Sequence, residues 1–342
     1  MNEMPNTLAQ RTHGELSAVL LDRLPYWVTP LLALAGLGLI GDASTWLTLT
    51  LAGLAMGMMI FVMASGLTLV FGLMDVLNFG HGAFISLGAF IGATVLLGLT
   101  GWVTVDSVWL NLAAVTLAVV AAMASTGALG LLFERVIVRP VYGAHLKQIL
   151  VTMGGLIVAE ELIHLVWGPN EIPLPRPESF KGAWSFGDVV IEKYRLVAVV
   201  LGLAIFLAMR WTLRRTRIGL LIRAGVENGE MVEALGYRIG MIFVAVFAAG
   251  SALAGLGGVM WGLYDELITA QMGINVLILV FIVVIIGGLG SVEGCFIGAL
   301  LVGLTANYTG YLEPKVALGS NILLMVAVLM WRPRGLLPAG ER

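Results

Sequence analysis

Long apolar runs are the feature that most limits the fold of this 342-residue chain. A helix that crosses the hydrocarbon core of a bilayer needs roughly 20 predominantly apolar residues. Runs of this kind lie near 26–41, 45–71, 78–99, 107–133, 148–167, 195–212, 240–264, 274–311 and 317–331. Only 12% of the residues are charged, which is about half of what water-soluble domains carry. The sequence therefore predicts an all-α, polytopic membrane protein.

The run 274–311 is too long for a single crossing. Its middle is interrupted by small and charged residues: Gly287, Gly288, Gly290, Ser291, Glu293 and Gly294. We interpret this run as two helices that meet at a glycine-rich break. This interpretation gives ten membrane segments, and nine segments is the alternative.

The distribution of Lys and Arg predicts the orientation, because these residues are concentrated in cytoplasmic loops. Arginines and lysines lie around 135–147, at 214–223 and after 331, whereas the alternate connections around Asp42 and Asp106 are short. The alternation holds only if 274–311 crosses twice. The expected organisation is a cytoplasmic tail at 1–24, a membrane domain at 25–331 and a cytoplasmic tail at 332–342. Within the membrane domain, 168–194 is an external loop and 213–239 is a cytoplasmic loop.

The loop 168–194 is long for a membrane connector. It holds prolines at 169, 173, 175 and 177, which oppose helix formation. The stretch SFGDVVIEKY within it is typical of a short strand or one arm of a hairpin. The loop is either a plain connector or a surface that contacts another molecule, and the residues leave both alternatives open.

Several classes of function lack the residues that they need. The single cysteine, Cys295, excludes an internal disulfide and a cysteine metal cluster. None of the four lysines follows a glycine, so the chain has no GxxxxGK[ST] phosphate loop. HExxH and GxSxG motifs are also missing. We therefore predict no catalytic residue, no metal site and no cofactor in this chain, and the net charge of −2 suggests no nucleic-acid partner.

Four pairs of glycines have the GxxxG spacing, which places both glycines on one face of a helix and lets two backbones approach closely. The pairs are Gly53/Gly57, Gly88/Gly92, Gly258/Gly262 and Gly294/Gly298. They serve either packing within this chain or a seam between subunits.

Ionisable residues inside a predicted span invite a functional hypothesis, because they are costly in lipid. Glu160, Glu161 and His164 lie near the external end of the run 148–167. Glu160 and His164 are four residues apart and could pair on one face. They form either an interfacial pair near the head groups, with Trp167 as an anchor, or part of a proton relay. Their role stays open.

The stretch DVLNFGHGAF, 75–84, precedes and begins another predicted span. Asn78 is expected to cap this helix, and glycines 80 and 82 permit close backbone approach. Two alternatives remain: structural capping, or a helix start at which Asn78 and His81 border a transport route.

A charged segment, RRTRIGLLIRAGVENGEMVEALGYRIG at 214–240, interrupts the apolar chain. Asn228 is expected to cap a short helix that has Glu230 in its first turn, and Gly236 is expected to end it in a left-handed conformation. The helix would present Met231, Val232, Ala234 and Leu235 as an apolar surface. A helix of about two turns is marginal alone in water, so it must dock, either on this chain or on a cytoplasmic partner.

Taken together, several stretches resemble the inner-membrane permease subunits of branched-chain amino acid ABC importers. The stretches are GLTLVFGLMDVLNFGHGAF, FERVIVRPV, RRTRIGLLIRAGVENGEMVEALGYRI, SALAGLGGVMWG, GGLGSVEGCFIGALLVG and WRPRGLLP. They follow the family's order and cover residues 55–338. One departure is Glu293, where members of the family often have a proline. The family's substrates include aliphatic amino acids, amides, urea and aromatic or dicarboxylic acids, so the substrate is left open.

The resemblance implies an importer-permease fold whose short cytoplasmic coupling helix docks on an ATPase. The expected coupling residues are Gly225, Val226, Glu227, Asn228, Gly229, Glu230, Met231, Val232, Glu233, Ala234, Leu235 and Gly236. The expected translocation route borders Asn78, His81, Gly287, Gly288 and Ser291.

The partners implied by the resemblance are a second, homologous permease, two cytoplasmic ATPase subunits that bind ATP and Mg, and a periplasmic substrate-binding protein. The chain itself would lie in the lipid of the bacterial inner membrane, with both termini cytoplasmic. Two other hypotheses are a proton- or sodium-coupled secondary transporter that needs no ATPase, and a membrane scaffold that does not transport.

Overall fold

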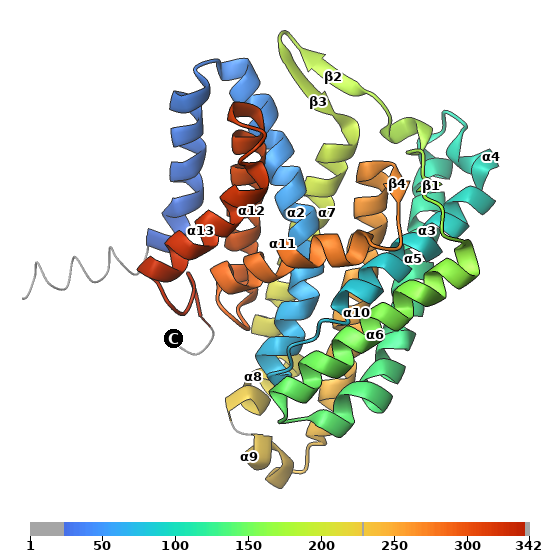
Figure 1. The fold of residues 1–342 in the computed structure, drawn as a ribbon, viewed down its shortest axis with the longest axis vertical. Coiled ribbons are helices and arrows are strands. Elements are labelled where there is room, and N and C mark those ends of the chain that lie inside the picture. Colours follow the sequence, from blue (N-terminus) through green and yellow to red (C-terminus); the bar gives the residue numbers. More distant parts are fainter. Residues whose placement is uncertain (1–23, 228, 339–342) are drawn as a thin grey trace, which may run out of the picture.

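A computed structural model describes residues 24–227 and 229–338 of the chain, most of which are helical (Figure 1). Ten apolar helices make up the described part: the first helix Leu24–Ile40, α2 Ala43–Met74, α3 His81–Gly98, α5 Val108–Phe133, α6 His145–Trp167, α7 Lys193–Arg215, α10 Ile239–Asp265, α11 Met272–Gly287, α12 Val292–Leu312 and α13 Ala317–Trp331. In the described residues, seven helices are long and apolar enough to cross a membrane, while the first helix, α11 and α13 are shorter. The prediction of an all-α polytopic membrane protein is confirmed.

Shorter elements connect these helices. They are α4 Thr100–Val103, the π-helical turn η1 Glu134–Val138, the 3-10 turns η2 Arg139–Val141 and η3 Glu178–Phe180, α8 Arg217–Glu227, α9 Gly229–Ala234, and the strands β1 Ile172–Pro173, β2 Ala183–Phe186, β3 Val189–Glu192 and β4 Leu267–Ile268. Strands β2 and β3 form an antiparallel hairpin, which confirms the strand expected in SFGDVVIEKY. Strand β1 pairs with β4, in register Ile172↔Ile268.

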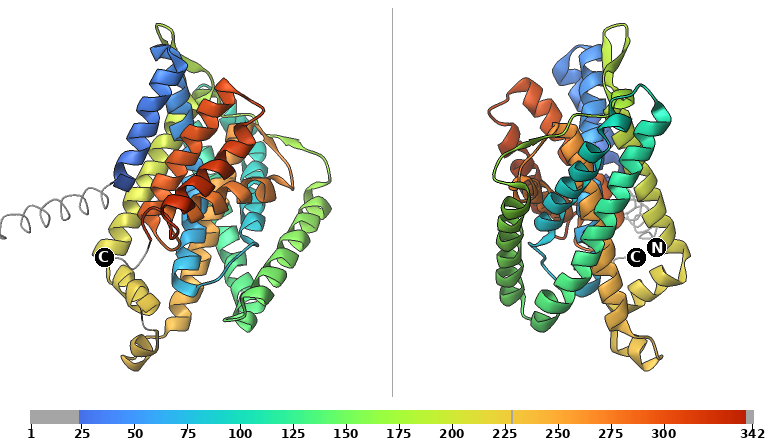
Figure 2. Two further views of the ribbon diagram at one scale, coloured as in Figure 1. Left: turned by 60° about the vertical axis from the view of Figure 1, so that its left-hand side comes forward. Right: turned by 90° about the vertical axis from the view of Figure 1, so that its right-hand side faces the viewer.

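The hairpin and the pair α8–α9 lie at opposite ends of the helix bundle (Figures 1 and 2). This separation matches the prediction that the loop 168–194 and the charged segment lie on opposite sides. The hairpin turns at Gly187, whose φ of 64° suits glycine.

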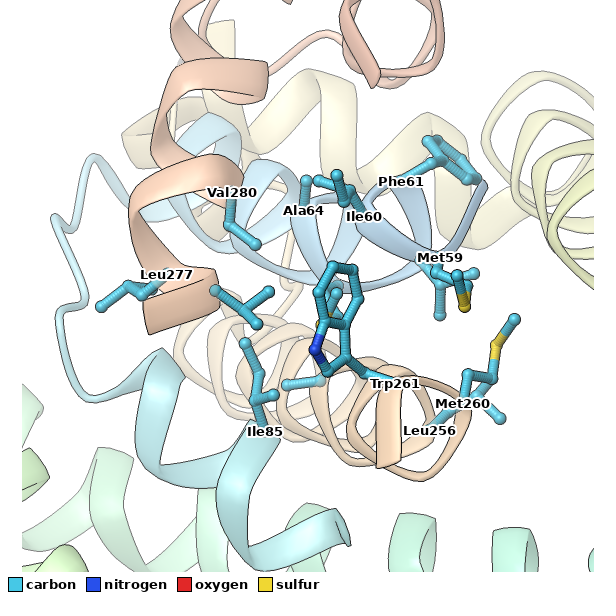
Figure 3. Close-up of a cluster of buried hydrophobic side chains, with 14 of the residues drawn as sticks. Met59, Ile60, Phe61, Ala64, Ile85, Leu256, Met260, Trp261, Leu277 and Val280 are labelled. Carbon is cyan, nitrogen blue, oxygen red and sulfur yellow. The ribbon is translucent and has the colours of Figure 1, made fainter. Parts of the chain in front are cut away.

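The core lies where α2, α3, α10 and α11 meet (Figure 3). Figure 3 shows Trp261 of α10 among side chains of the other three helices, which include Ile60 of α2, Ile85 of α3 and Val280 of α11. These three aliphatic side chains are fully excluded from solvent. Helix α2 also packs against α7 and α12 and is the most enclosed of the long helices.

Glycines let these helices approach closely. A Cβ atom placed on Gly57 of α2 would lie 2.7 Å from the carbonyl oxygen of Ala299 on α12, and one on Gly53 would lie 2.9 Å from Cα of Leu304. Neither distance leaves room for a side chain. The other three GxxxG pairs likewise meet helices or strands of this chain: Gly88 meets Gly255, Gly92 meets Val259, Gly258 meets Ile85, Gly262 meets Ile268, Gly294 meets Gly287 and Gly298 meets Val283. The first alternative, packing within one chain, is therefore confirmed.

The glycine-rich break is a tight turn between α11 and α12, as predicted. Helix α11 ends at Gly287, and Gly288 has φ +99°. Ser291 then caps α12, because its hydroxyl oxygen accepts a hydrogen bond from the backbone N–H of Gly294 at 3.1 Å. The chain from 332 to 338 folds back on this turn: the N–H groups of Leu336 and Leu337 donate to the carbonyl groups of Ile286 and Gly287 at 2.8 and 3.0 Å.

The expected helix cap at Asn78 is wrong. Helix α3 begins at His81 with Gly80 in the cap position, and no side chain caps it. The preceding residues instead form a tight turn in which the N–H of His81 donates to the carbonyl of Asn78 at 3.3 Å and the N–H of Ala83 donates to that of Gly80 at 3.0 Å. Backbone groups therefore satisfy donors that a side-chain cap would otherwise serve.

Candidate functional site

The start of α3 lies inside the protein, with His81 and Asn78 each 1% exposed. Nε2 of His81 lies 2.8 Å from the carbonyl oxygen of Met63, in the middle of α2. This contact requires a proton on Nε2, so a neutral ring keeps a free lone pair on Nδ1. Among the described residues, neither Nδ1 of His81 nor Oδ1 of Asn78 has a hydrogen-bond partner. Two buried polar atoms are thus left for a ligand or water.

Met63 precedes the end of α2 by eleven residues. At 1.5 Å per residue, α3 therefore begins roughly 16 Å along α2 from its end. Discontinuous helices of this kind are typical of membrane transporters, because their exposed backbone ends bind polar groups at the middle of the bilayer.

The start of α11 meets the start of α3. The Ser86 hydroxyl donates to the carbonyl of Ala270 at 2.8 Å and accepts from the N–H of Gly273 at 2.9 Å. A Cβ on Gly82 would lie 3.1 Å from the oxygen of Gly273, so the two backbones are nearly in contact. Figure 1 shows α11 running across the bundle rather than along it. Two helix N-termini, which favour negative groups, therefore converge at one place.

The expected translocation residues fall into two separate groups. Asn78 and His81 lie where α3 and α11 begin, whereas Gly287, Gly288 and Ser291 lie at the other end of α11. Fifteen helical steps separate Met272 from Gly287, which is roughly 22 Å. The structure does not bring the two groups together.

The charged segment forms two helices, α8 and α9, rather than one. The expected coupling stretch 225–236 is divided between the last residues of α8, which include Gly225, Val226 and Glu227, and the six residues of α9 from Gly229. Asn228 lies outside the described residues, so its expected cap is not observed. Gly236 has φ +88° and follows α9, as predicted.

The faces of α9 differ from the expectation in one respect. Val232 is only 3% exposed and therefore packs within this chain, which is the first of the two alternatives, so it is not available to a partner. Met231, Leu235 and Tyr237 are 58%, 70% and 50% exposed. Glu230, Glu233 and Ala234 are exposed as well. A surface of apolar and acidic side chains is thus open at this end.

Gly225 of α8 lies close to the helix bundle. A Cβ there would lie 3.6 Å from Cδ1 of Leu73 at the end of α2 and 3.5 Å from Cδ1 of Ile239 at the start of α10. Helix α8 packs against α2, and α9 packs against α10.

An ion-pair cluster that sequence reasoning missed lies near this end. Glu293 in the first turn of α12 pairs with Arg214 and, at 3.5 Å, with Arg210, both near the end of α7. The available signal was the four-residue spacing of the two arginines, which places both on one face of α7.

A second missed residue, Arg176, holds the opposite end together. Its side chain is 13% exposed and pairs with Glu192 at 3.0 Å and Glu266 at 3.1 Å. It also donates to the carbonyl groups of Leu263 and Tyr264, at 2.8 and 2.6 Å, where α10 ends. The loop 168–194 is thereby fixed to α10. Its charge-balanced sequence gave no signal that singled out Arg176.

The acidic pair in α6 is arranged differently from the expectation. His164 pairs with Glu161 at 3.9 Å, three residues away, and not with Glu160. The Glu161 side chain is 75% exposed at the surface of this chain. Trp167 is anchored to α3, because its indole N–H donates to the Thr94 hydroxyl at 2.8 Å.

These features define a multi-pass membrane transport protein: apolar helices packed through glycine, a helix that begins inside the core, and a separate helical segment at one end. The family model described as "Branched-chain amino acid transport system / permease component" matches residues 49–330. The chain therefore belongs to this family, and the family expected from the motifs is confirmed. It is a transport permease subunit and not an enzyme.

Known relatives are similar over most of their length. LivH of Escherichia coli K12, a high-affinity branched-chain amino acid transport system permease protein, is 27% identical over 84% of this chain and 94% of its own length. BraD of Pseudomonas aeruginosa, which has the same description, is 30% identical with the same coverage. LivM of E. coli K12 is 27% identical over 82% of this chain and 68% of its own length. No solved structure matches the chain.

Proposed function

We propose that this chain is one of two permease subunits of an ATP-driven importer in a bacterial inner membrane, with both termini in the cytoplasm. Its substrates are branched-chain amino acids or related amides and carboxylates. A periplasmic binding protein delivers the substrate, and two cytoplasmic ATPase subunits bind the ATP and Mg. The branched-chain amino acid transport of LivH and BraD supports the substrate class, and similarity to both LivH and LivM supports a second permease.

The observation that carries the ATPase contact is the open surface of α9 and of the turn that follows it. Met231, Leu235 and Tyr237 expose apolar area beside Glu230 and Glu233. A helix of six residues is too short to be stable by itself in water. Docking on an ATPase buries this area, and the packing of α8 against α2 and of α9 against α10 would transmit the movement. Arginines at 214, 215, 217 and 223 support a cytoplasmic location for this end.

The opposite end supports a contact with a binding protein. Trp184 and Phe186 of the β2–β3 hairpin are 49% and 68% exposed. The Arg176 cluster holds the loop in one position, which lowers the conformational entropy lost when a partner binds.

Substrate would pass the place where α3 and α11 begin. The carboxylate of an amino acid suits two converging helix N-termini. His81 Nδ1 and Asn78 Oδ1 are buried polar atoms that could take part. Gly287, Gly288 and Ser291 would contribute through the turn that holds the other end of α11.

Leu235→Asp tests the proposed ATPase contact, because it puts a charge on an exposed apolar position without touching the core. We expect the ATPase subunits to co-purify poorly with this variant, and ATPase stimulation by the loaded binding protein to fall at least tenfold. Val190→Asp, at a 49% exposed position of the hairpin, is the matched control at the opposite end. It should keep the ATPase subunits. Equal co-purification of both variants would refute the contact.

A further inference from the structure

A cavity of about 590 Å³ opens between the first helix, α7 and α12. Its lining comes from one face of each helix. Helix α12 contributes Glu293, Phe296, Ile297 and Leu300, which follow the spacing i, i+3, i+4 and i+7 of a single face. Helix α7 contributes Phe206, Arg210 and Arg214, spaced four residues apart, and the first helix contributes Tyr26, Thr29 and Pro30.

The two ends of this cavity differ in chemistry. Arg210, Arg214 and Glu293 lie at one end, and together they carry a net charge of +1. Leu300 lies two helical turns further along α12, so the apolar part extends roughly 10 Å from the charges. The rings of Phe206 and Phe296 stack with centroids 4.0 Å apart and form an aromatic wall.

The arginines retain hydrogen-bond donors. The pairs with Glu293 use Nε of Arg210 and Nη2 of Arg214. A guanidinium group carries five N–H donors, which is more than one such pair uses. The side chains of Arg210 and Arg214 are 47% and 42% exposed, so an anion can reach them. Guanidinium groups bind phosphate through paired N–H groups.

We propose that this cavity binds an anionic phospholipid from the leaflet at the arginine-rich end of the protein. The phosphate contacts Arg210 and Arg214, and an acyl chain lies along Phe206, Phe296 and Leu300. A soluble anion would leave the apolar part of the cavity unfilled, whereas a lipid matches both parts. Basic pockets between membrane helices bind anionic head groups in this way.

Glu293 sets the affinity of the site. Its carboxylate holds the two guanidinium groups together, but it also competes with the lipid phosphate for them. Removing its charge therefore raises the net charge of the cluster and strengthens lipid binding. A cluster that only stabilises the fold gives no such gain.

The test uses the purified full-length chain in nanodiscs of phosphatidylethanolamine with a minor fraction of phosphatidylglycerol. Native mass spectrometry measures the phosphatidylglycerol retained after release. Each arginine near a membrane surface contributes about 1 kcal/mol to such binding, or about fivefold in affinity. We expect about thirtyfold weaker retention in the double variant Arg210→Gln/Arg214→Gln, and unchanged retention in Arg215→Gln, which removes an equal charge outside the cavity.

Two further variants keep the test decisive if the double variant does not fold. Glu293→Gln should retain more phosphatidylglycerol than the unaltered chain. Leu300→Trp should retain less, because it fills the apolar part while leaving the arginines in place. Inorganic phosphate should not displace the lipid. Equal retention in all variants, weaker retention in Glu293→Gln, or displacement by inorganic phosphate would overturn the proposal.

Discussion

Gly288 is a position where one added methyl group should both strain the backbone and clash with a neighbouring segment. Its φ of +99° lies in a region that residues with a Cβ rarely adopt. A Cβ there would lie 2.9 Å from Cα of Pro338 and 3.1 Å from the carbonyl oxygen of Arg334. Both neighbours are backbone atoms, so no side-chain rotation can relieve the contact. Gly288→Ala must therefore either strain the turn or displace the chain from 334 to 338.

The magnitude follows from these two effects. A strained backbone conformation costs about 1–3 kcal/mol, and overpacking costs about 1–3 kcal/mol more unless the neighbour moves. We expect a total loss of about 2–6 kcal/mol in stability, and the lower end of this range if the chain from 334 to 338 moves away. We also expect release of the C-terminal segment, because displacing Pro338 pulls on the hydrogen bonds from Leu336 and Leu337 to the end of α11.

Two measurements check this prediction. Thermal unfolding of the purified chain reports the loss of stability, and hydrogen exchange at the amides of Leu336 and Leu337 reports release of the segment. Gly154→Ala is the matched control, because a Cβ at Gly154 of α6 meets no atom within 4 Å. If Gly288→Ala unfolds at the same temperature as this control, with the two amides still protected, the reasoning from backbone strain is wrong.

Three other predictions address the topology, the proposed route and pH. A cysteine that replaces Glu233 should react with a membrane-impermeant maleimide only from the cytoplasm, and a cysteine that replaces Asp188 should react only from outside. The native Cys295 is buried and should not react. The reverse labelling pattern would show that the proposed orientation is wrong. His81→Leu removes the contact with Met63 and should lower uptake about tenfold while ATPase subunits still co-purify; normal uptake would exclude His81 from the route. Hydrogen bonds from Ser44 and Thr45 lower the pKa of Asp42 from 3.8 to about 2. The pKa of Asp42 is lower in the folded chain than in the unfolded one, so the capping hydrogen bond should stabilise α2 above about pH 4. This stabilisation should be lost as the pH falls through about 2. Hydrogen exchange at the Thr45 amide should therefore become faster at low pH in the unaltered chain, and should not depend on pH in this way in Asp42→Asn.

The arrangement of the charged segment was only partly predictable. Gly236 could be placed because a glycine after a short amphipathic stretch is a local signal for the end of a helix. The burial of Val232 could not be predicted, because four of the six residues 230–235 are apolar and they do not mark one face of the helix. The packing of α8 against α2 joins helices more than a hundred residues apart in the chain, so no local pattern predicts it.

The sequence by itself determined the class of fold, the approximate positions of the apolar helices and the turn at Gly288, with nine or ten segments left open. These follow from local causes: the length of apolar residues that spans a bilayer, and the backbone conformations open to glycine. Only the tertiary structure decided that α3 begins beside Met63, that Arg176 closes the opposite end, and that Glu293 joins Arg210 and Arg214. Such contacts join residues between 16 and 90 positions apart, so their partners are set by how the helices pack and not by any local pattern.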